Sequence, residues 1–118
     1  MDKDTAKNVL TLAAVQMTST SVLEENLETA RTFIDQASAG GADIIALPEN
    51  FSVMSETEHQ RQDAARRVDE VEAMLSAAAR DHGTEIFGGS TPLPAPDGRV
   101  TNTCLVYDDH GRRIGRFD

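Results

Sequence analysis

Two short apolar segments separated by an amphipathic stretch open the chain. Val9–Gln16 and Asp43–Leu47 are too short for helices and fit strands that are buried on both faces. Between them, apolar residues recur at spacings of three and four, which is typical of one face of a helix. The members of this stripe are Leu23, Leu27, Ala30, Ile34 and Ala37.

Capping signals mark the ends of this predicted helix. Ser21 followed by Glu24 is the pattern of a capping box, in which each side chain bonds to a free backbone N–H of the first turn. Gly40-Gly41 can supply the left-handed residue that ends the helix, and Pro48 stops the strand that follows. A strand, a helix and a strand in this order predict parallel strands with a right-handed crossover.

The middle of the chain predicts a second crossover. Glu56–Arg67 is polar and is expected to be helical in part, as a lid or an irregular loop over a site. The next helix carries Val68, Val71, Leu75 and Ala78 on one face and ends at Gly83. Thr84–Gly88 then predicts a third strand.

The C-terminal third predicts a loop and a hairpin. Thr91–Gly98 holds three prolines and is expected to be a loop. Thr101–Tyr107 and Arg112–Phe117 flank Asp108-Asp109-His110-Gly111, whose glycine suits a tight hairpin turn. The predicted fold class is therefore α/β: βαβαβ followed by an antiparallel β-hairpin, with one sheet covered by helices.

Length and composition limit the number of domains and exclude several classes of binding partner. The 118 residues fit a single domain, 1–118, with a polar N-terminal extension over 1–8. A net charge of −9 argues against nucleic acid and anionic membranes as partners. One cysteine cannot close an internal disulfide, and no apolar stretch reaches the roughly 20 residues of a membrane span. With a polar start that lacks a signal peptide, these features predict a cytoplasmic protein.

Glu49 is the most informative candidate for chemistry. It follows a predicted buried strand and Pro48, at the carboxyl end of a strand that should be parallel. Ligands of open α/β sheets bind outside such strand ends. A carboxylate beside Leu47 and Phe51, partly shielded from water, could act as a general base, although an exposed loop glutamate is the common alternative.

The other reactive side chains favour structural roles. Cys104 lies within a predicted strand, where a small apolar side chain packs well, and not on an accessible turn beside a base. His59, His82 and His110 lack the spacing of a metal site or a catalytic triad. Gly88-Gly89-Ser90 lacks the residues of a phosphate loop. These residues therefore favour neither a metal site nor a phosphate-binding loop.

Five segments can be compared with known protein families. They are LAAVQMTS (Leu12–Ser19), the helix containing EENLETA with Asn26, GADIIALPENF (Gly41–Phe51), FGGSTPL (Phe87–Leu93) and NTCLVYDDHGRRIGRFD (Asn102–Asp118). Taken together, they resemble the nitrilase superfamily of carbon–nitrogen hydrolases, and they are most similar to its bacterial deaminated-glutathione-amidase-like members. The likeness covers nearly the whole chain from about Leu10 onward.

The resemblance implies an amidase-type hydrolase acting on a small amide or nitrile through a Cys-Glu-Lys thioester mechanism. It implies no cofactor and no metal, because thiol chemistry with a fixed ammonium needs neither. The family's glutamate, the general base, falls on Glu49. The family's lysine follows the segment that matches Arg116-Phe117-Asp118, its nucleophilic cysteine lies further on, and Cys104 does not correspond to it. The chain therefore resembles the first half of an α-β-β-α sandwich, an incomplete hydrolase domain.

Two expectations follow from this match. The 118 residues alone should be inactive, and the uncovered sheet face should make the chain self-associating or a homo-oligomer. The alternatives are a catalytically inactive nitrilase-like interaction module or truncated gene product, and an unrelated α/β protein that binds a small molecule.

Overall fold

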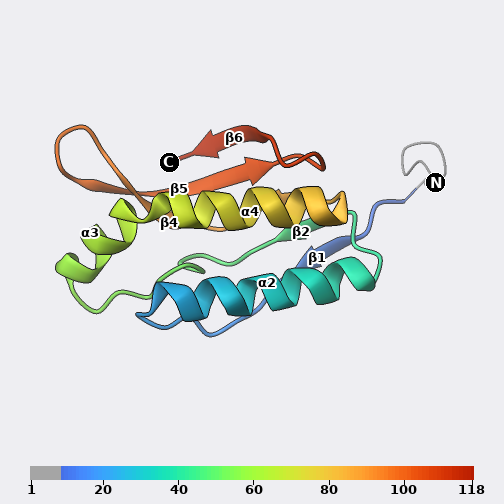
Figure 1. The fold of residues 1–118 in the computed structure, drawn as a ribbon, viewed down its shortest axis with the longest axis horizontal. Coiled ribbons are helices and arrows are strands. Elements are labelled where there is room, and N and C mark those ends of the chain that lie inside the picture. Colours follow the sequence, from blue (N-terminus) through green and yellow to red (C-terminus); the bar gives the residue numbers. More distant parts are fainter. Residues whose placement is uncertain (1–8) are drawn as a thin grey trace.

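One mixed β-sheet with helices on one face is the framework of residues 9–118, the part of the chain that the computed structural model describes (Figure 1). The predicted extension over 1–8 lies outside the described residues. The strands are β1 (Leu12–Ala14), β2 (Ile44–Ala46), β3 (Glu85–Phe87), β4 (Thr91–Pro94), β5 (Val100–Tyr107) and β6 (Arg113–Phe117). The helices are α2 (Leu23–Ala39), α3 (Glu58–Arg66) and α4 (Val68–His82).

The strand order confirms the predicted topology. The sheet runs β1-β2-β3-β5-β4, and β6 pairs with β5. β1, β2 and β3 are parallel, with Ala13 beside Ile45 and Ile45 beside Ile86. β5 is antiparallel to β3, β4 and β6, so the chain is βαβαβ with a C-terminal hairpin.

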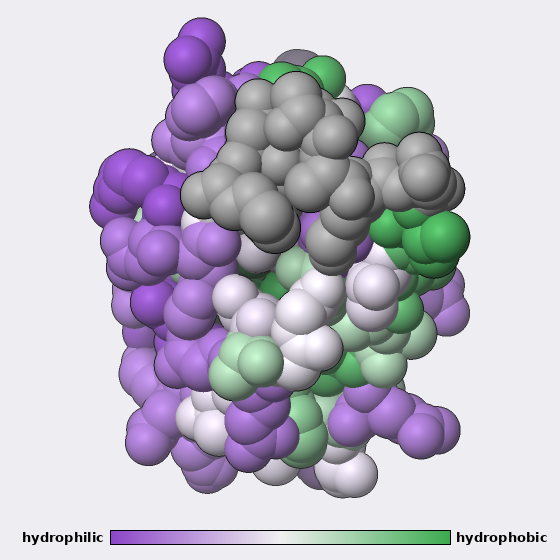
Figure 2. Space-filling view, turned by 90° about the vertical axis from the view of Figure 1, so that its right-hand side faces the viewer, coloured by the Kyte–Doolittle hydropathy of each residue, from purple (hydrophilic) through white to green (hydrophobic). Residues whose placement is uncertain are grey.

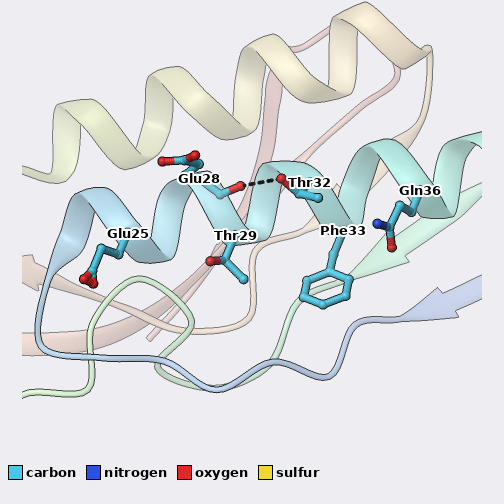
Figure 3. Close-up of a pocket in the computed structure, with 6 residues that line it drawn as sticks. All are labelled: Glu25, Glu28, Thr29, Thr32, Phe33 and Gln36. Carbon is cyan, nitrogen blue, oxygen red and sulfur yellow. Dashed lines mark hydrogen bonds between the residues drawn. The ribbon is translucent and has the colours of Figure 1, made fainter.

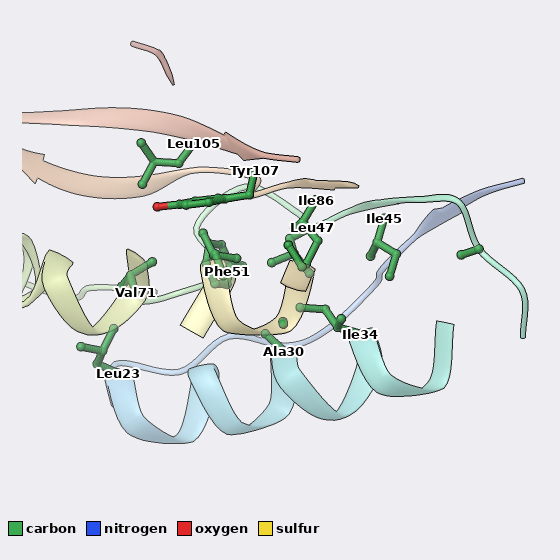
Figure 4. Close-up of a cluster of buried hydrophobic side chains, with 14 of the residues drawn as sticks. Leu23, Ala30, Ile34, Ile45, Leu47, Phe51, Val71, Ile86, Leu105 and Tyr107 are labelled. Carbon is green, nitrogen blue, oxygen red and sulfur yellow. The ribbon is translucent and has the colours of Figure 1, made fainter. Parts of the chain in front are cut away.

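The core lies between the sheet and the two long helices. α2 and α4 lie side by side on the sheet, and their apolar stripes meet the side chains of the central strands (Figures 1 and 4). Ile34, Ile45, Leu75 and Ile86 are fully buried there. The predicted stripes of both helices are thus confirmed as core faces, and Gly83 ends α4 in the left-handed conformation at φ 60°.

The opposite face of the sheet is apolar and partly uncovered. We call it the open sheet face; its side chains alternate with the core residues. Glu85, Cys104 and Val106 lie on this face, and its other apolar members are Leu12, Ala14, Ile44, Ala46, Phe87 and Phe117. Leu12 is 65% exposed and Phe117 is 63% exposed. Figure 2 shows hydrophilic side chains gathered on one side of the molecule and hydrophobic ones along the other. The prediction that Val9–Gln16 is buried on both faces is therefore wrong, because helices cover only one face of β1.

The predicted capping box is not formed. α2 begins at Leu23 after the N-cap residue Val22, and no side chain caps its first turn. Thr20 Oγ1 instead accepts a hydrogen bond of 3.1 Å from the Val22 N–H. Glu24 pairs with Arg67, at the start of α4, so its carboxylate forms a tertiary ion pair in place of the predicted capping contact.

The loop predicted over Thr91–Gly98 is wrong in its first half, where the chain forms β4. Pro92 and Pro94 pair with Asn102 and Val100 of β5. β4 lies at the end of the strand order, and prolines are tolerated in an edge strand because its outer N–H positions need no partner.

The remaining predicted elements are confirmed. Part of the polar segment Glu56–Arg67 is helical as α3, whose N-cap Thr57 accepts a hydrogen bond from the Gln60 N–H. α3 packs on β4, and Arg61 donates to the Val100 carbonyl. Gly111, at φ 81°, lies in the hairpin turn. Within residues 9–118, every helix is too short or too polar to cross a membrane.

Candidate active site

Glu49 lies on a turn that leaves the carboxyl end of β2. The parallel pairing with β3 continues one residue beyond β2, since the Leu47 N–H donates to the Phe87 carbonyl at 2.9 Å. Pro48 has no N–H and ends the ladder there. Glu49 therefore lies at the rim of the sheet where β3 also ends, which is where the topology predicts a ligand site.

The side chain of Glu49 is exposed in the described structure, whereas its neighbours are not. Leu47 is 6% exposed and Phe51 is fully buried, and both point into the core (Figure 4). The expected shielding of the carboxylate beside these two residues is therefore wrong for the described residues. The apolar neighbours hold the turn in place and leave the carboxylate open to solvent.

Hydrogen bonds to other segments hold the turn that carries Glu49 at several points. We call residues 47–52 the Glu49 turn. The Asn50 N–H donates to Ser90 Oγ at 2.8 Å, and Ser52 Oγ is hydrogen-bonded to Thr91 Oγ1. Ser19 Oγ donates to the Phe51 carbonyl at 3.2 Å. The segments after β1, β2 and β3 thus meet around this turn.

Asn26 of α2 also forms hydrogen bonds to the Glu49 turn. It is 2% exposed, and its amide nitrogen donates to the Thr20 and Ser52 carbonyls, each at 2.8 Å. Its amide oxygen accepts from the Thr20 N–H at 2.8 Å. The sequence carried a signal for this role, because Asn26 lies between Leu23 and Leu27 on the apolar face of the helix.

Cys104 does not behave as a nucleophile in this structure. It lies in β5 opposite Phe117, and it is half-buried. Burial raises the pKa of its thiol, so the thiol stays protonated at neutral pH. This agrees with the structural role expected for it.

The histidines lie apart from the Glu49 turn, each beside a carboxylate. His59 pairs with Asp63 on α3, and His110 lies near Asp109 in the hairpin turn. His82 donates to Asp35 at 2.6 Å and joins the ends of α4 and α2. Among residues 9–118, no group of three or more acidic, histidine or cysteine side chains could hold a metal ion.

A surface hollow along α2 is separate from this site. Figure 3 shows its lining residues, which are Glu25, Glu28, Thr29, Thr32, Phe33 and Gln36. All of them belong to α2, and none is part of the Glu49 turn. The hollow therefore adds nothing to the candidate chemistry at the sheet rim.

Comparison with known proteins assigns the family. The profile described as "Carbon-nitrogen hydrolase" matches residues 11–118. The chain belongs to the carbon–nitrogen hydrolase family. The resemblance to the nitrilase superfamily predicted from the sequence is thereby confirmed, and the match includes the Glu49 turn.

Curated relatives include several amidases. The chain is 32% identical over 107 residues to a deaminated glutathione amidase of Synechocystis sp., covering 89% of this chain and 39% of the relative. It is 34% identical over 113 residues to omega-amidase NIT2 of Xenopus tropicalis, covering 91% of this chain and 41% of the relative. The chain thus spans about two fifths of the length of these relatives.

Solved structures share the fold. The NitFhit protein of C. elegans matches with a TM-score of 0.84 at 26% identity, over 92% of this chain and 28% of that protein. An amidase from Nesterenkonia sp. matches with a TM-score of 0.73 at 26% identity, over 92% of this chain and 41% of that protein. The α/β architecture predicted from the sequence is therefore that of nitrilase-superfamily proteins.

Proposed function

We propose that these residues carry the general base, Glu49, of an amidase-type carbon–nitrogen hydrolase that cleaves small amides or nitriles by a Cys-Glu-Lys thioester mechanism. The observation that supports this most is the place of Glu49, on an anchored turn at the carboxyl end of a central parallel strand. The family match and the amidase names of the relatives support the reaction class.

The proposed chemistry divides into three roles. A cysteine thiol gives its proton to Glu49 as the sulfur attacks the amide carbon, and a lysine ammonium stabilises the charge on the tetrahedral oxygen. The C–N bond breaks, ammonia leaves with the proton that Glu49 returns, and water hydrolyses the thioester. In the family, the lysine and the cysteine belong to segments that follow the one matching Arg116–Asp118.

The exposure of Glu49 is consistent with this division of roles. A general base works best where water is excluded. We propose that the segments bearing the lysine and the cysteine cover Glu49 and build the rest of the pocket. The 118 residues by themselves should then bind no amide in a reactive position and release no ammonia.

The test begins with the gene. The reading frame should be sequenced beyond codon 118 and the whole frame expressed, and ammonia release from short ω-amides should be measured. Replacing Glu49 by Gln should lower kcat by about 10² to 10⁴-fold, the usual contribution of a general base. Glu28→Gln, an exposed glutamate on α2, is the matched control. Full activity in Glu49→Gln would disprove the proposed role.

A non-catalytic interaction module is the second candidate. The exposed apolar residues of the open sheet face favour it, because soluble monomers rarely leave such patches uncovered. We propose that the 118-residue chain, when alone, self-associates through this face in the cytoplasm. A stop codon directly after Asp118 together with stable dimers would favour this candidate over the enzyme.

A further inference from the structure

An irregularity in the sheet lies directly beside the Glu49 turn. β3 and β4 pair with the same strand, β5, and follow each other along it. From Phe87 to Thr91 the chain takes four steps, while the paired residues of β5, Val106 to Thr103, take three. The segment 88–90 therefore forms a bulge with one extra residue. Bulges of this kind often redirect the chain next to functional sites.

Gly89 in this bulge lies against the peptide that precedes Glu49. A Cβ atom placed on Gly89 would be 2.0 Å from the Pro48 carbonyl oxygen and 2.7 Å from the Leu47 carbonyl oxygen. Gly89 also has a φ of 57°, a conformation that other residues rarely adopt. The close approach of the bulge to the Pro48–Glu49 peptide thus requires glycine.

Ser90 binds the peptide that follows Glu49. Its hydroxyl oxygen accepts the hydrogen bond from the Asn50 N–H at 2.8 Å. Asn50 has a φ of 54° and is the one described residue other than glycine with a positive φ. A left-handed residue at this point turns the chain sharply, and such a conformation persists only where the surroundings hold it.

We propose that Gly89 and Ser90 are positioning residues for Glu49, because they fix the two peptide groups on either side of it. This inference rests on the proposed function of Glu49 as the general base. The side chain of Glu49 is exposed and forms no hydrogen bond of its own within residues 9–118, so its direction depends on the backbone. Fixing both neighbouring peptides sets the Cα–Cβ direction from which the carboxylate reaches the reacting sulfur.

The experiment measures the order of the Glu49 backbone in the 118-residue chain by NMR, at a dilution that limits self-association. The readouts are the exchange rate of the Asn50 N–H and the residual dipolar coupling of the Glu49 Cα–Hα bond. The variants are Ser90→Ala, Ser90→Thr and Gly89→Ala. Two matched controls are Ser76→Ala, which removes a serine bond to the Gly111 carbonyl, and Gly83→Ala, a glycine at φ 60° with open space around it.

Ser90→Ala should accelerate Asn50 exchange about fivefold or more, as expected for loss of one hydrogen bond, and should reduce the Glu49 coupling. Ser90→Thr, which keeps the hydroxyl, should restore both readouts. Gly89→Ala should change the Glu49 coupling, whereas Ser76→Ala and Gly83→Ala should leave it unchanged. Should Gly89→Ala fail to fold, the two Ser90 variants decide the question. An unchanged Glu49 coupling and Asn50 exchange rate in Ser90→Ala would overturn the inference.

The effect on catalysis is measured separately, as kcat and KM of the protein expressed from the complete reading frame. Ser90→Ala should lower kcat about tenfold or more, with KM nearly unchanged, because misplaced catalytic groups slow the chemical step more than binding. Unchanged kcat in Ser90→Ala, with Glu49→Gln inactive, would overturn the positioning role and leave the proposed function intact. Full activity in Glu49→Gln would instead refute the proposed function, while the NMR result would still report how Glu49 is held.

Discussion

Asn26 is the side chain that connects the most segments around the candidate site. Its hydrogen bonds join α2 to the chain before it, at Thr20, and to the Glu49 turn, at Ser52. Ser52 is fully buried, so water cannot replace Asn26 as the partner of its carbonyl, whereas the Thr20 carbonyl also accepts from the Met54 N–H. A buried polar side chain of this kind stabilises the fold by what its loss would leave unpaired.

Replacing Asn26 by Leu should therefore lower the free energy of unfolding by about 2 to 4 kcal/mol, although Leu is the more apolar residue. The measurement is urea denaturation at one dilute protein concentration. Gln36→Leu, at an exposed position of the same helix, is the control and should change the free energy by less than about 0.5 kcal/mol. Equal effects of the two substitutions would show that the buried hydrogen bonds contribute little.

At the scale of elements, a charged cluster joins the C-terminal ends of α2 and α4. Arg31 donates to Asp35 at 2.9 Å and to Asp81 at 3.1 Å, and His82 donates to Asp35. The hydrogen bond from His82, followed by that from Arg31, holds the pKa of Asp35 below its ordinary value. A carboxyl group whose pKa is lower in the folded than in the unfolded state stabilises the fold when it is ionised.

Asp35→Asn should consequently destabilise the chain at neutral pH by at most about 1 kcal/mol, because Asp35 is half-exposed and water screens its interactions. The stabilisation from Asp35 is present above the unfolded carboxyl pKa of about 4 and is lost as the pH falls through the lower folded-state pKa. Melting curves of both proteins across this range should therefore converge at low pH. A difference that stays constant down to the lowest pH would contradict the link to Asp35 ionisation.

For the whole molecule, the main feature is the difference between the two faces of the sheet. Helices α2 and α4 cover one face (Figure 1), whereas the open sheet face exposes the large apolar side chains of Leu12 and Phe117. Within residues 9–118, β1 ends the sheet on one side, and its outer edge pairs with no other strand. An apolar face next to a free strand edge is a surface through which two copies of a chain can associate.

The 118-residue chain should sediment as dimers or larger species at micromolar concentration. Leu12→Lys and Phe117→Lys should each raise the dissociation constant about tenfold or more, since burying one such side chain contributes about 1.5 to 3 kcal/mol. Val22→Lys, at an exposed apolar residue before α2, is the control and should leave association unchanged. Analytical ultracentrifugation measures all four proteins. A wild-type chain that stays monomeric at every concentration would show that the open sheet face does not mediate association.

The sequence by itself determined the features that depend on neighbours along the chain. The spacing of Leu23, Ala30 and Ile34 determined the buried face of α2, and Gly83 determined where α4 ends, because helical periodicity and left-handed caps are local properties. The order of these elements was enough to predict the parallel strands, the hairpin and the place of Glu49 at the end of β2.

Only the tertiary structure decided which groups meet across long separations. The proline-rich segment at Pro92 forms a strand because it pairs with β5. Leu12 is exposed because the helices cover only the other face of the sheet. The bond between Asn50 and Ser90 joins residues 40 positions apart. The exposure of Glu49 likewise depends on what packs around its turn. A local pattern specifies the conformation of a segment, but its partners and its burial depend on the register and packing of distant segments.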